Sequence, residues 1–453
     1  MLDSPRTVTW CAAFLILALS GCRPSSESDS RQRSDTSSDS GELPASAHLD
    51  GTIVEHEEET AGTRDDSDFP VLSPFGEMTA QQHYEAGLAA EKANDTKSAV
   101  EHYTVSLEID PHNDIVRKQL GAVLLQLKRY IDASVLFGQM VEADPSDADA
   151  HNDWGVVLVR IGNLDEAIQQ FGESLALKPD HPDAHYNLAT ALLAAGRPAD
   201  ALEHLTETLR IHPSYTDAYF TLGKFYLQQH DIEPAIAQFQ HILKINREYE
   251  GLDYQLGRAY KGQGDLRQAV LHFSEAVRRD PLNYEARFAL GQCLAEYGNH
   301  PGAFAQFAEA ARLEPERPEA HFHLAQVLQK LGRTEEAIAH YDAALNLRPD
   351  WPEALNNLAW LLATTSDDLL RDPERALQLA QQAKTMADLK MPLILDTLAA
   401  AQASVGAFED AVNTAAEAVH KAQANEHAEI AAEIEQRQQR YERQEPYREV
   451  ESR

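Results

Sequence analysis

The sequence has little positive charge. Its 453 residues include 39 lysines and arginines against 73 aspartates and glutamates, which gives a formal net charge of -34 at pH 7. Proteins bind a nucleic-acid backbone through basic surface, so a chain this acidic would repel phosphate. The composition therefore excludes nucleic acid as a partner, although a hydrophobic fraction of 43% is enough for a large folded core.

Cysteine is also scarce. The chain has three cysteines, Cys11, Cys22 and Cys293. Three are too few for a disulfide framework of the kind that holds small secreted domains together. We expect Cys293, which lies next to Leu294 in a predicted helix, to pack as a small apolar residue.

The N-terminal region has no hydrophobic run long enough to cross a bilayer. Its apolar run, residues 8–19, is about a dozen residues long, whereas a membrane-spanning helix needs about 20. The small residues Ser20 and Gly21 follow directly, as a cleavage site requires. Residues 1–21 are therefore predicted to be a signal peptide.

The four residues Leu19-Ser20-Gly21-Cys22 resemble the lipobox of bacterial lipoproteins. In that family the cysteine sulfur receives a diacylglycerol, and the cysteine becomes the first residue after cleavage. The resemblance implies that Cys22 is lipidated and anchors the protein in a bacterial cell envelope, extracytoplasmic, at the periplasmic face or the outer membrane. The alternatives are an ordinary secretory signal with an incidental cysteine, and a cytosolic protein with a misassigned start.

Residues 22–77 are rich in serine and in acidic side chains and poor in large apolar ones. Such a segment has too little apolar surface to offset the entropy cost of ordering, so we expect it to be disordered. A coil of about 55 residues has an r.m.s. reach of roughly 40 Å. Together with Cys22, the segment is predicted to form a tether between the lipid and a folded body.

Catalytic motifs are missing from the sequence. It has no His-Glu-x-x-His pair of a metalloprotease, no phosphate-binding glycine loop followed by lysine, no nucleophile elbow and no haem attachment pair. Gly262 and Gly264 fall at a predicted helical turn, which accounts for them without a nucleotide. We expect no catalytic residue and no cofactor, and we predict that the protein is not an enzyme.

What the sequence has instead is a 34-residue repeat. A small residue lies twelve positions before each alanine of the repeat, and a mostly aromatic residue lies four positions after it. A proline follows each alanine by twelve positions except in one unit, where Arg247 takes its place. The alanines that define the register are Ala99, Ala133, Ala167, Ala201, Ala235, Ala269, Ala303 and Ala337.

Each repeat is predicted to be a pair of helices. Apolar residues recur at helical spacing on two successive segments. Glycines such as Gly162 and Gly264 separate the segments, where a left-handed residue can end a helix. The proline ends the second helix because it lacks the N–H group needed to continue. Small residues are expected where the two helix backbones approach closely, with the large residue filling the adjoining groove.

These columns resemble the 34-residue signature of the tetratricopeptide repeat family. The resemblance implies an all-α fold, an α-solenoid of about ten helical hairpins with a C-terminal capping helix. We predict eight regular repeats over residues 78–351, two irregular repeats over 352–424, and the capping helix and a tail over 425–453. The ninth repeat is irregular because Ala376 arrives five residues late, and the tenth because Ala415 replaces the bulky residue.

The resemblance also implies a surface for partners. In this family the first helices of successive repeats line a concave face, which commonly binds an extended peptide or a partner helix. One column on these helices is aromatic in five consecutive repeats, and a mostly acidic column lies three residues earlier. The predicted peptide-binding residues are Tyr186, Phe220, Tyr254, Phe288, Phe322, Lys224 and Arg258. The alternative is that the aromatics belong to the core and that the carboxylates stabilise helix N-termini.

Histidines recur nineteen residues apart in three repeats: His83 and His102, His185 and His204, His321 and His340. A metal site needs three or four convergent ligands, so pairs alone are insufficient and we predict no metal site.

The sequence therefore predicts a non-enzymatic scaffold, tethered to a membrane by lipid, which binds protein or peptide partners during assembly of an envelope complex or during secretion. The alternative is an accessory subunit that presents substrates to a separate modifying enzyme, such as an O-GlcNAc transferase-like system. The repeat region with its "ALNNLAWLLA" stretch is similar to the repeat portion of those transferases.

Replacing the predicted lipid attachment site tests the anchor. Cys22→Ser removes the only sulfur that the lipobox offers, so we expect the variant to move from the membrane pellet to the soluble fraction. Fractionation with immunoblotting measures this, and Cys11→Ser is the matched control, which should stay with the membrane. Membrane retention of the Cys22 variant would refute lipid as the sole tether.

Overall fold

The computed structural model describes residues 78–386, 392–425 and 427–449. The predicted signal peptide over residues 1–21, Cys22 and the predicted tether over residues 22–77 lie outside the described residues. The lipid anchor therefore stays a prediction.

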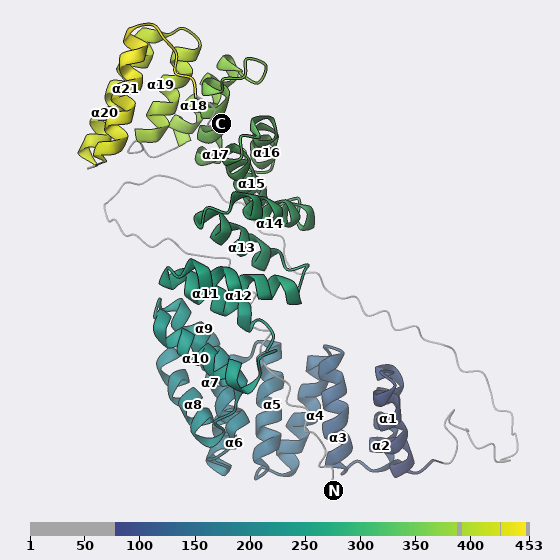
Figure 1. Cartoon of the computed structure of the whole chain (residues 1–453). Coiled ribbons are helices and arrows are strands. Elements are labelled where there is room, and N and C mark those ends of the chain that lie inside the picture. The colour runs from purple at the N-terminus through teal and green to yellow at the C-terminus, as the bar shows by residue number, and fades with distance from the viewer. Residues whose placement is uncertain (1–77, 387–391, 426, 450–453) are drawn as a thin grey trace, which may run out of the picture. The chain divides into compact units, whose positions relative to one another are not determined.

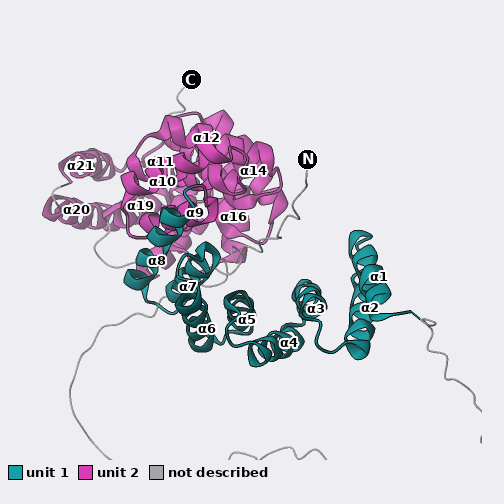
Figure 2. Ribbon diagram, turned by 90° about the horizontal axis from the view of Figure 1, so that it is seen from below, with its two compact units in different colours: residues 1–213 teal, residues 214–453 magenta. Residues whose placement is uncertain are grey.

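The described residues form α-helices joined by short turns and contain no β-strand (Figure 1). Each helix contacts the next one along the chain, which makes a series of helical hairpins. The chain divides into two compact units, with the boundary between Pro213 and Ser214 (Figure 2). The predicted all-α solenoid of hairpins is confirmed.

Unit 1 holds four hairpins. Its helices are α1 (Ala80–Lys92), α2 (Thr96–Ile109), α3 (Asp114–Gln126), α4 (Tyr130–Ala143), α5 (Ala148–Ile161), α6 (Leu164–Leu177), α7 (Pro182–Ala194) and α8 (Pro198–Ile211).

Unit 2 holds the other hairpins and a final helix. Its helices are α9 (Thr216–Gln228), α10 (Ile232–Ile245), α11 (Leu252–Gln263), α12 (Leu266–Arg279), α13 (Tyr284–Glu296), α14 (His300–Leu313), α15 (Pro318–Lys330), α16 (Thr334–Leu347), α17 (Pro352–Thr364), α18 (Pro373–Met386), α19 (Pro392–Ser404), α20 (Phe408–Ala424) and α21 (Ala428–Glu442). Among the described residues, no helix has the length and apolarity of a membrane span.

The turn inside each regular hairpin contains one residue with positive φ. Glycine fills this position in five hairpins, as predicted, because it takes the left-handed conformation without a Cβ clash. The other three hairpins place a residue with a side chain there, at a conformational cost of about 1–2 kcal/mol. The eight residues are Asn94, Lys128, Gly162, Gly196, His230, Gly264, Gly298 and Gly332.

The two helices of a hairpin meet at the alanine column. All eight alanines of the repeat have no exposed surface, and the large residue four positions later is also buried. On the facing helix the small residue leaves room for that ring. A Cβ placed on Gly155 would lie 2.6 Å from Cε1 of Phe171, closer than two carbons can approach. Glycine is required here by close packing, not by its φ angle.

The irregular repeats keep the same packing with local changes. Helices α17 and α18 are separated by residues 365–372, the enlarged turn that the late Ala376 predicts. In the following hairpin the missing bulky residue is replaced by Ala415, which is fully buried. Helix α21 then covers α20 through Ile434 and Tyr441, both with no exposed surface, so the predicted capping helix is present.

The loops between hairpins are held by a recurring contact. A histidine or arginine six residues after the proline donates a hydrogen bond to the proline carbonyl. His185 Nε2 lies 2.9 Å from the Pro179 oxygen, and Arg287 Nε lies 2.8 Å from the Pro281 oxygen. Since a carbonyl only accepts, this bond also fixes the proton of His185 on Nε2.

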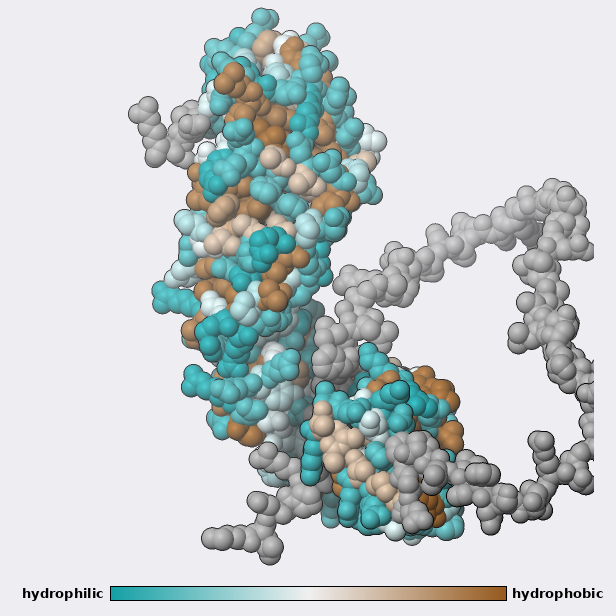
Figure 3. Space-filling view, turned by 90° about the vertical axis from the view of Figure 1, so that its right-hand side faces the viewer, coloured by the Kyte–Doolittle hydropathy of each residue, from teal (hydrophilic) through white to brown (hydrophobic). Residues whose placement is uncertain are grey.

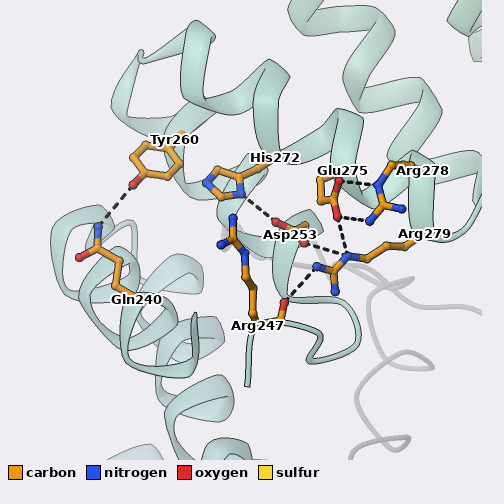
Figure 4. Close-up of polar contacts among 8 residues, drawn as sticks. All are labelled: Gln240, Arg247, Asp253, Tyr260, His272, Glu275, Arg278 and Arg279. Atoms are coloured by element: carbon orange, nitrogen blue, oxygen red, sulfur yellow. Dashed lines mark hydrogen bonds and ion pairs between the residues drawn. The ribbon is translucent and has the colours of Figure 1, made fainter. Parts of the chain in front are cut away.

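The repeat that lacks the proline replaces this contact with a different one (Figure 4). Asp253 occupies the donor position and cannot donate, so Arg279 on α12 donates to the Arg247 carbonyl at 3.0 Å instead. The buried Asp253 carboxylate in turn lies 2.8 Å from His272 Nδ1 and 3.3 Å from Arg279 Nε. This repeat therefore departs from the others at two positions, with Arg247 in place of the proline and Asp253 in place of the donor, and Arg279 contacts both residues.

The predicted histidine pairs form in three hairpins. The two Nδ1 atoms lie 3.2 Å apart for His83 and His102, 2.9 Å for His185 and His204, and 3.1 Å for His321 and His340. Two protonated rings cannot form this contact, because both carry a positive charge and neither Nδ1 atom can then accept a hydrogen bond. Burial first, and the partner imidazole second, lowers the pKa of His83, His204 and His340 below 6.5.

Filling the space beside a repeat glycine should destabilise unit 1. Gly155→Ala forces its methyl group into the Phe171 ring, and overpacking of this kind typically costs about 1–3 kcal/mol. Gly172→Ala is the matched control, because a Cβ there meets nothing within 4 Å. The control should gain up to about 1 kcal/mol from helix propensity. Thermal melts followed by circular dichroism measure both, and equal midpoints would contradict the packing argument.

Acid should destabilise the repeats that carry histidine pairs. A histidine whose folded pKa is lowered stays neutral in the folded chain, while the unfolded chain takes up a proton near pH 6.5. Stability from the neutral pairs is thus fully present above pH 6.5 and is lost as the pH falls towards the lowered values. We expect the thermal midpoint to fall between about pH 7.5 and pH 5.5.

A matched variant isolates this effect from general acid denaturation. In the hairpin of His151, Gln170 takes the place of the second histidine, with Oε1 2.7 Å from Nδ1 of His151. A glutamine amide can either donate through its nitrogen or accept through its oxygen, so His204→Gln with His340→Gln keeps a bridge to the remaining histidine and removes a titrating group from two pairs. The variant should lose less stability on acidification than the unmodified chain, and parallel pH curves would refute the role of the pairs.

Candidate functional site

A hollow in unit 2 is lined mainly by α13, α15, α17 and α19, with residues of α14 and α21. Its volume is about 730 Å³, and apolar and polar residues share its lining. On the face shown in the space-filling view, apolar residues are interrupted by polar ones (Figure 3). Lining residues include Glu296 on α13, His323 and Lys330 on α15, Asn356 and Trp360 on α17, Asp396 on α19, Arg437 on α21, and Glu449.

The five aromatic residues of the predicted stripe differ in exposure. Tyr186 and Phe322 are buried, with 2% and 7% of their surface exposed, whereas Phe220, Tyr254 and Phe288 are half-buried. Phe322 is covered by Trp351, whose ring centroid lies 4.4 Å away. Only the three half-buried rings therefore offer surface to a ligand. The peptide-binding role of the stripe stays a prediction.

The half-buried rings rest on the core of their own hairpins. Phe220 lies 5.9 Å from Phe239, and Tyr254 lies 5.8 Å from Phe273, measured between ring centroids. In each case the second ring is the large residue of the repeat, nineteen positions later. One side of each predicted binding ring is thus fixed by packing, which lowers the entropy lost when a ligand contacts the other side.

Several carboxylates of the acidic column three residues before the aromatics are paired with basic side chains. Glu285 on α13 lies 2.5 Å from Arg317 in the loop before α15, and Glu319 is paired with Arg348 in the same way. In unit 1, Asp149 lies 3.4 Å from Lys178 and 3.1 Å from His181. These carboxylates tie one hairpin to the next, so fewer of them are available to a basic partner than the sequence indicates.

Two of the predicted cationic residues stand beside the stripe. Lys224 Nζ lies 4.9 Å from the ring centroid of Phe220, a cation–π contact, and burial lowers the pKa of Lys224. Arg258 is exposed and donates a hydrogen bond to Gln255 at 3.0 Å. The two residues extend from α9 and α11, four positions after Phe220 and Tyr254.

The polar floor of the hollow was missed by the sequence reasoning. Asp396, with 2% of its surface exposed, accepts two hydrogen bonds from Arg437 at 2.8 and 3.0 Å. Burial raises the pKa of Asp396, and the guanidinium opposes that rise. The Oδ1 atom of Asn356 is buried and has no hydrogen-bond partner. Asp396 is the only charged residue of α19, so the sequence could have marked it as a buried carboxylate that needs a partner. The partner itself could not be predicted, because Arg437 lies 41 residues away.

The described residues bring no metal-binding cluster together. No group of three or more histidine, cysteine, aspartate or glutamate side chains converges on one point in the part of the chain that the structure describes. Cys293 is buried as expected, and burial raises the pKa of its thiol to about 11. A thiol with that pKa stays protonated at neutral pH and is a poor nucleophile.

Two family models, both described as tetratricopeptide repeat, match the chain. One matches residues 152–216 and 254–321. The other matches residues 90–152, 192–256 and 294–361. Together they extend without a gap from residue 90 to residue 361, which is more than half of the chain. No curated protein sequence matches this chain significantly.

Solved structures of repeat proteins resemble the chain at low identity. One chain of the APC/C hetero-tetramer Cut9-Hcn1 is 20% identical with a TM-score of 0.43, and the match covers 61% of this chain and 54% of that one, about half its length. The structure of pilF of Pseudomonas aeruginosa is 17% identical with a TM-score of 0.42, and the match covers 48% of this chain and 98% of that one. YrrB, described as a TPR protein with an unusual peptide-binding site, is 21% identical with a TM-score of 0.31, and the match covers 49% of this chain and 96% of that one. Similarity at this level indicates the fold alone.

The repeat register, the left-handed turns and the buried alanine column agree with the family models over the same residues. This chain belongs to the tetratricopeptide repeat family.

Proposed function

We propose that the protein is a non-enzymatic scaffold that binds extended segments of partner proteins on the concave faces of its hairpin stacks. Tetratricopeptide repeats in general serve protein–protein interaction, which supports the coarse role. The observation that carries the finer proposal is the row of half-buried rings at Phe220, Tyr254 and Phe288. Each ring packs against the core of its hairpin and keeps part of its surface exposed, although Tyr249 also contacts Phe220 at 5.0 Å and His323 contacts Phe288 at 5.3 Å between ring centroids.

The chemistry of this surface favours a partner with apolar side chains at regular spacing. Aromatic rings that are already fixed in place supply large contact area at low entropy cost, and such residues dominate binding energies. Lys224 and Arg258 add positive charge beside the rings, while much of the acidic column is paired within the stack. An acidic or polar residue next to the apolar anchors of the partner would therefore be tolerated.

We further propose that this scaffold is tethered to the extracytoplasmic side of a bacterial envelope through a lipid on Cys22 and takes part in assembling an envelope or secretion complex. The support is the lipobox-like Leu19-Ser20-Gly21-Cys22 and the acidic, serine-rich residues that follow. A long charged tether would hold the folded units away from anionic headgroups.

The experiment compares proteins captured from solubilised envelopes by the unmodified chain and by Phe220→Leu with Tyr254→Leu. Leucine keeps the apolar contact with Phe239 and Phe273 and removes the aromatic face. Loss of two anchoring rings should reduce capture of the dominant partner about tenfold or more. Melting should change little.

Tyr297→Ala is the matched control. Tyr297 is an aromatic residue with 53% of its surface exposed, and it lies outside the stripe. The Tyr297→Ala variant should leave capture of the dominant partner unchanged. Equal capture by the unmodified chain, the double leucine variant and this control would refute the proposed surface. A transferase or protease as the dominant partner would instead favour the alternative, in which the chain presents substrates to a separate modifying enzyme.

A further inference from the structure

The chain turns back on itself after α21. Gln444 has a φ of 61°, and the Glu445 N–H donates to the Arg440 carbonyl at 3.0 Å, which closes the helix end. Pro446 follows and prevents the helix from continuing. We call residues 444–449 the return segment.

The return segment runs to the end of α17. The Glu449 N–H donates to the Thr364 carbonyl at 2.8 Å, and Arg448 Nη1 donates to the Ala363 carbonyl at 3.0 Å. The carboxylate of Glu449 accepts a hydrogen bond from Trp360 Nε1 at 3.0 Å. These contacts join positions that are 85 to 89 residues apart in the sequence.

Most contacts of the return segment with α17 are polar and lie at the surface, and Tyr447 also packs against the core formed by α19, α20 and α21. Tyr447 and Arg448 are half-buried and Glu449 is exposed. The Tyr447 ring lies 5.8 Å from the Trp360 ring, and the Arg437 guanidinium lies 5.6 Å from the first and 5.3 Å from the second. A backbone hydrogen bond, the Arg448 guanidinium, one carboxylate and one tilted ring pair therefore hold the segment.

The segment also occupies one end of the hollow in unit 2. Glu449, Trp360 and Arg437 belong to its lining, together with Asn356. Arg437 is kept in place by its two hydrogen bonds to the buried Asp396. An extended ligand lying along this face would meet the return segment at Trp360.

We propose that the return segment is a displaceable intramolecular ligand of this face. An extended partner segment that carries an aromatic residue and, two positions later, a glutamate takes over the same contacts with Trp360 and Arg437 when the return segment leaves. This inference rests on the proposed function, because it concerns one end of a surface that binds extended segments.

The test measures binding of the segment in trans. The probe is an acetylated and amidated hexapeptide with the sequence of residues 444–449. The released variant is the full chain with Tyr447→Ala, Arg448→Ala and Glu449→Ala. The matched control is Arg443→Ala with Glu445→Ala, which changes neighbouring side chains that have no contact with α17.

The sequence has four tryptophans, so a chain labelled with nitrogen-15 tryptophan gives at most four indole signals. Trp360→Phe assigns the relevant one.

A linked segment acts at an effective concentration on the order of millimolar. A peptide with a dissociation constant near 0.1 mM would thus bind the unmodified chain about tenfold more weakly than the released variant. We expect the Trp360 signal of the released variant to shift on titration, with a tenfold higher affinity than in the unmodified chain or the control. A peptide of the same composition in scrambled order should not bind.

Two results would overturn the proposal. One is no shift of the Trp360 signal of the released variant at several millimolar peptide, which would make the segment a fixed cap of α17. The other is equal affinity in the unmodified chain and the released variant, which would place the peptide elsewhere. If the triple variant loses helicity, Glu449→Ala alone replaces it, with a smaller difference of about threefold. The assay uses no external partner, so its failure leaves capture at Phe220 and Tyr254 untouched.

Discussion

The structure depends on one contact that every regular hairpin repeats. A fully buried alanine on the second helix, and the large residue one turn later, pack against a glycine or alanine on the first helix. The close approach of the two backbones lets each ring fill the groove that the missing side chain leaves. Because all eight regular hairpins share this spacing, the outward-facing columns stay in register within each unit, and the aromatic stripe is a consequence of that register.

The periodic part of the fold was predictable from the sequence. The columns around Ala99 and its equivalents predict where each helix begins and ends, and the late Ala376 predicts the enlarged turn after α17. Left-handed turns were predictable only where glycine occupies them. Lys128 and His230 take the same conformation, because closing the hairpin outweighs the local cost at a single residue.

The features that sequence reasoning missed are those without a period. Arg247 was recognised as a missing proline, but its link to Asp253 and Arg279 depends on a carbonyl that no sequence pattern exposes. Arg437 and Asp396 meet across 41 residues, and Trp360 and Glu449 across 89. Nor did the column predict exposure. Phe322 and Phe220 occupy equivalent positions, but Phe322 is buried under Trp351 at 4.4 Å, whereas Phe220 stays half-buried beside Tyr249 at 5.0 Å. Neighbours from the next repeat decide which rings a ligand can reach.

The ion pairs between successive hairpins are exposed to dissolved salt. Glu285 with Arg317, Glu319 with Arg348 and Asp149 with Lys178 are exposed or partly exposed pairs that join one hairpin to the next. Dissolved ions screen such pairs over a Debye length of about 8 Å at physiological salt. They also screen the self-repulsion of a chain with a net charge of -34. Added salt therefore weakens the pairs between hairpins while it also reduces the repulsion between acidic surfaces within each unit, so the junctions between hairpins respond to salt more than single hairpins do.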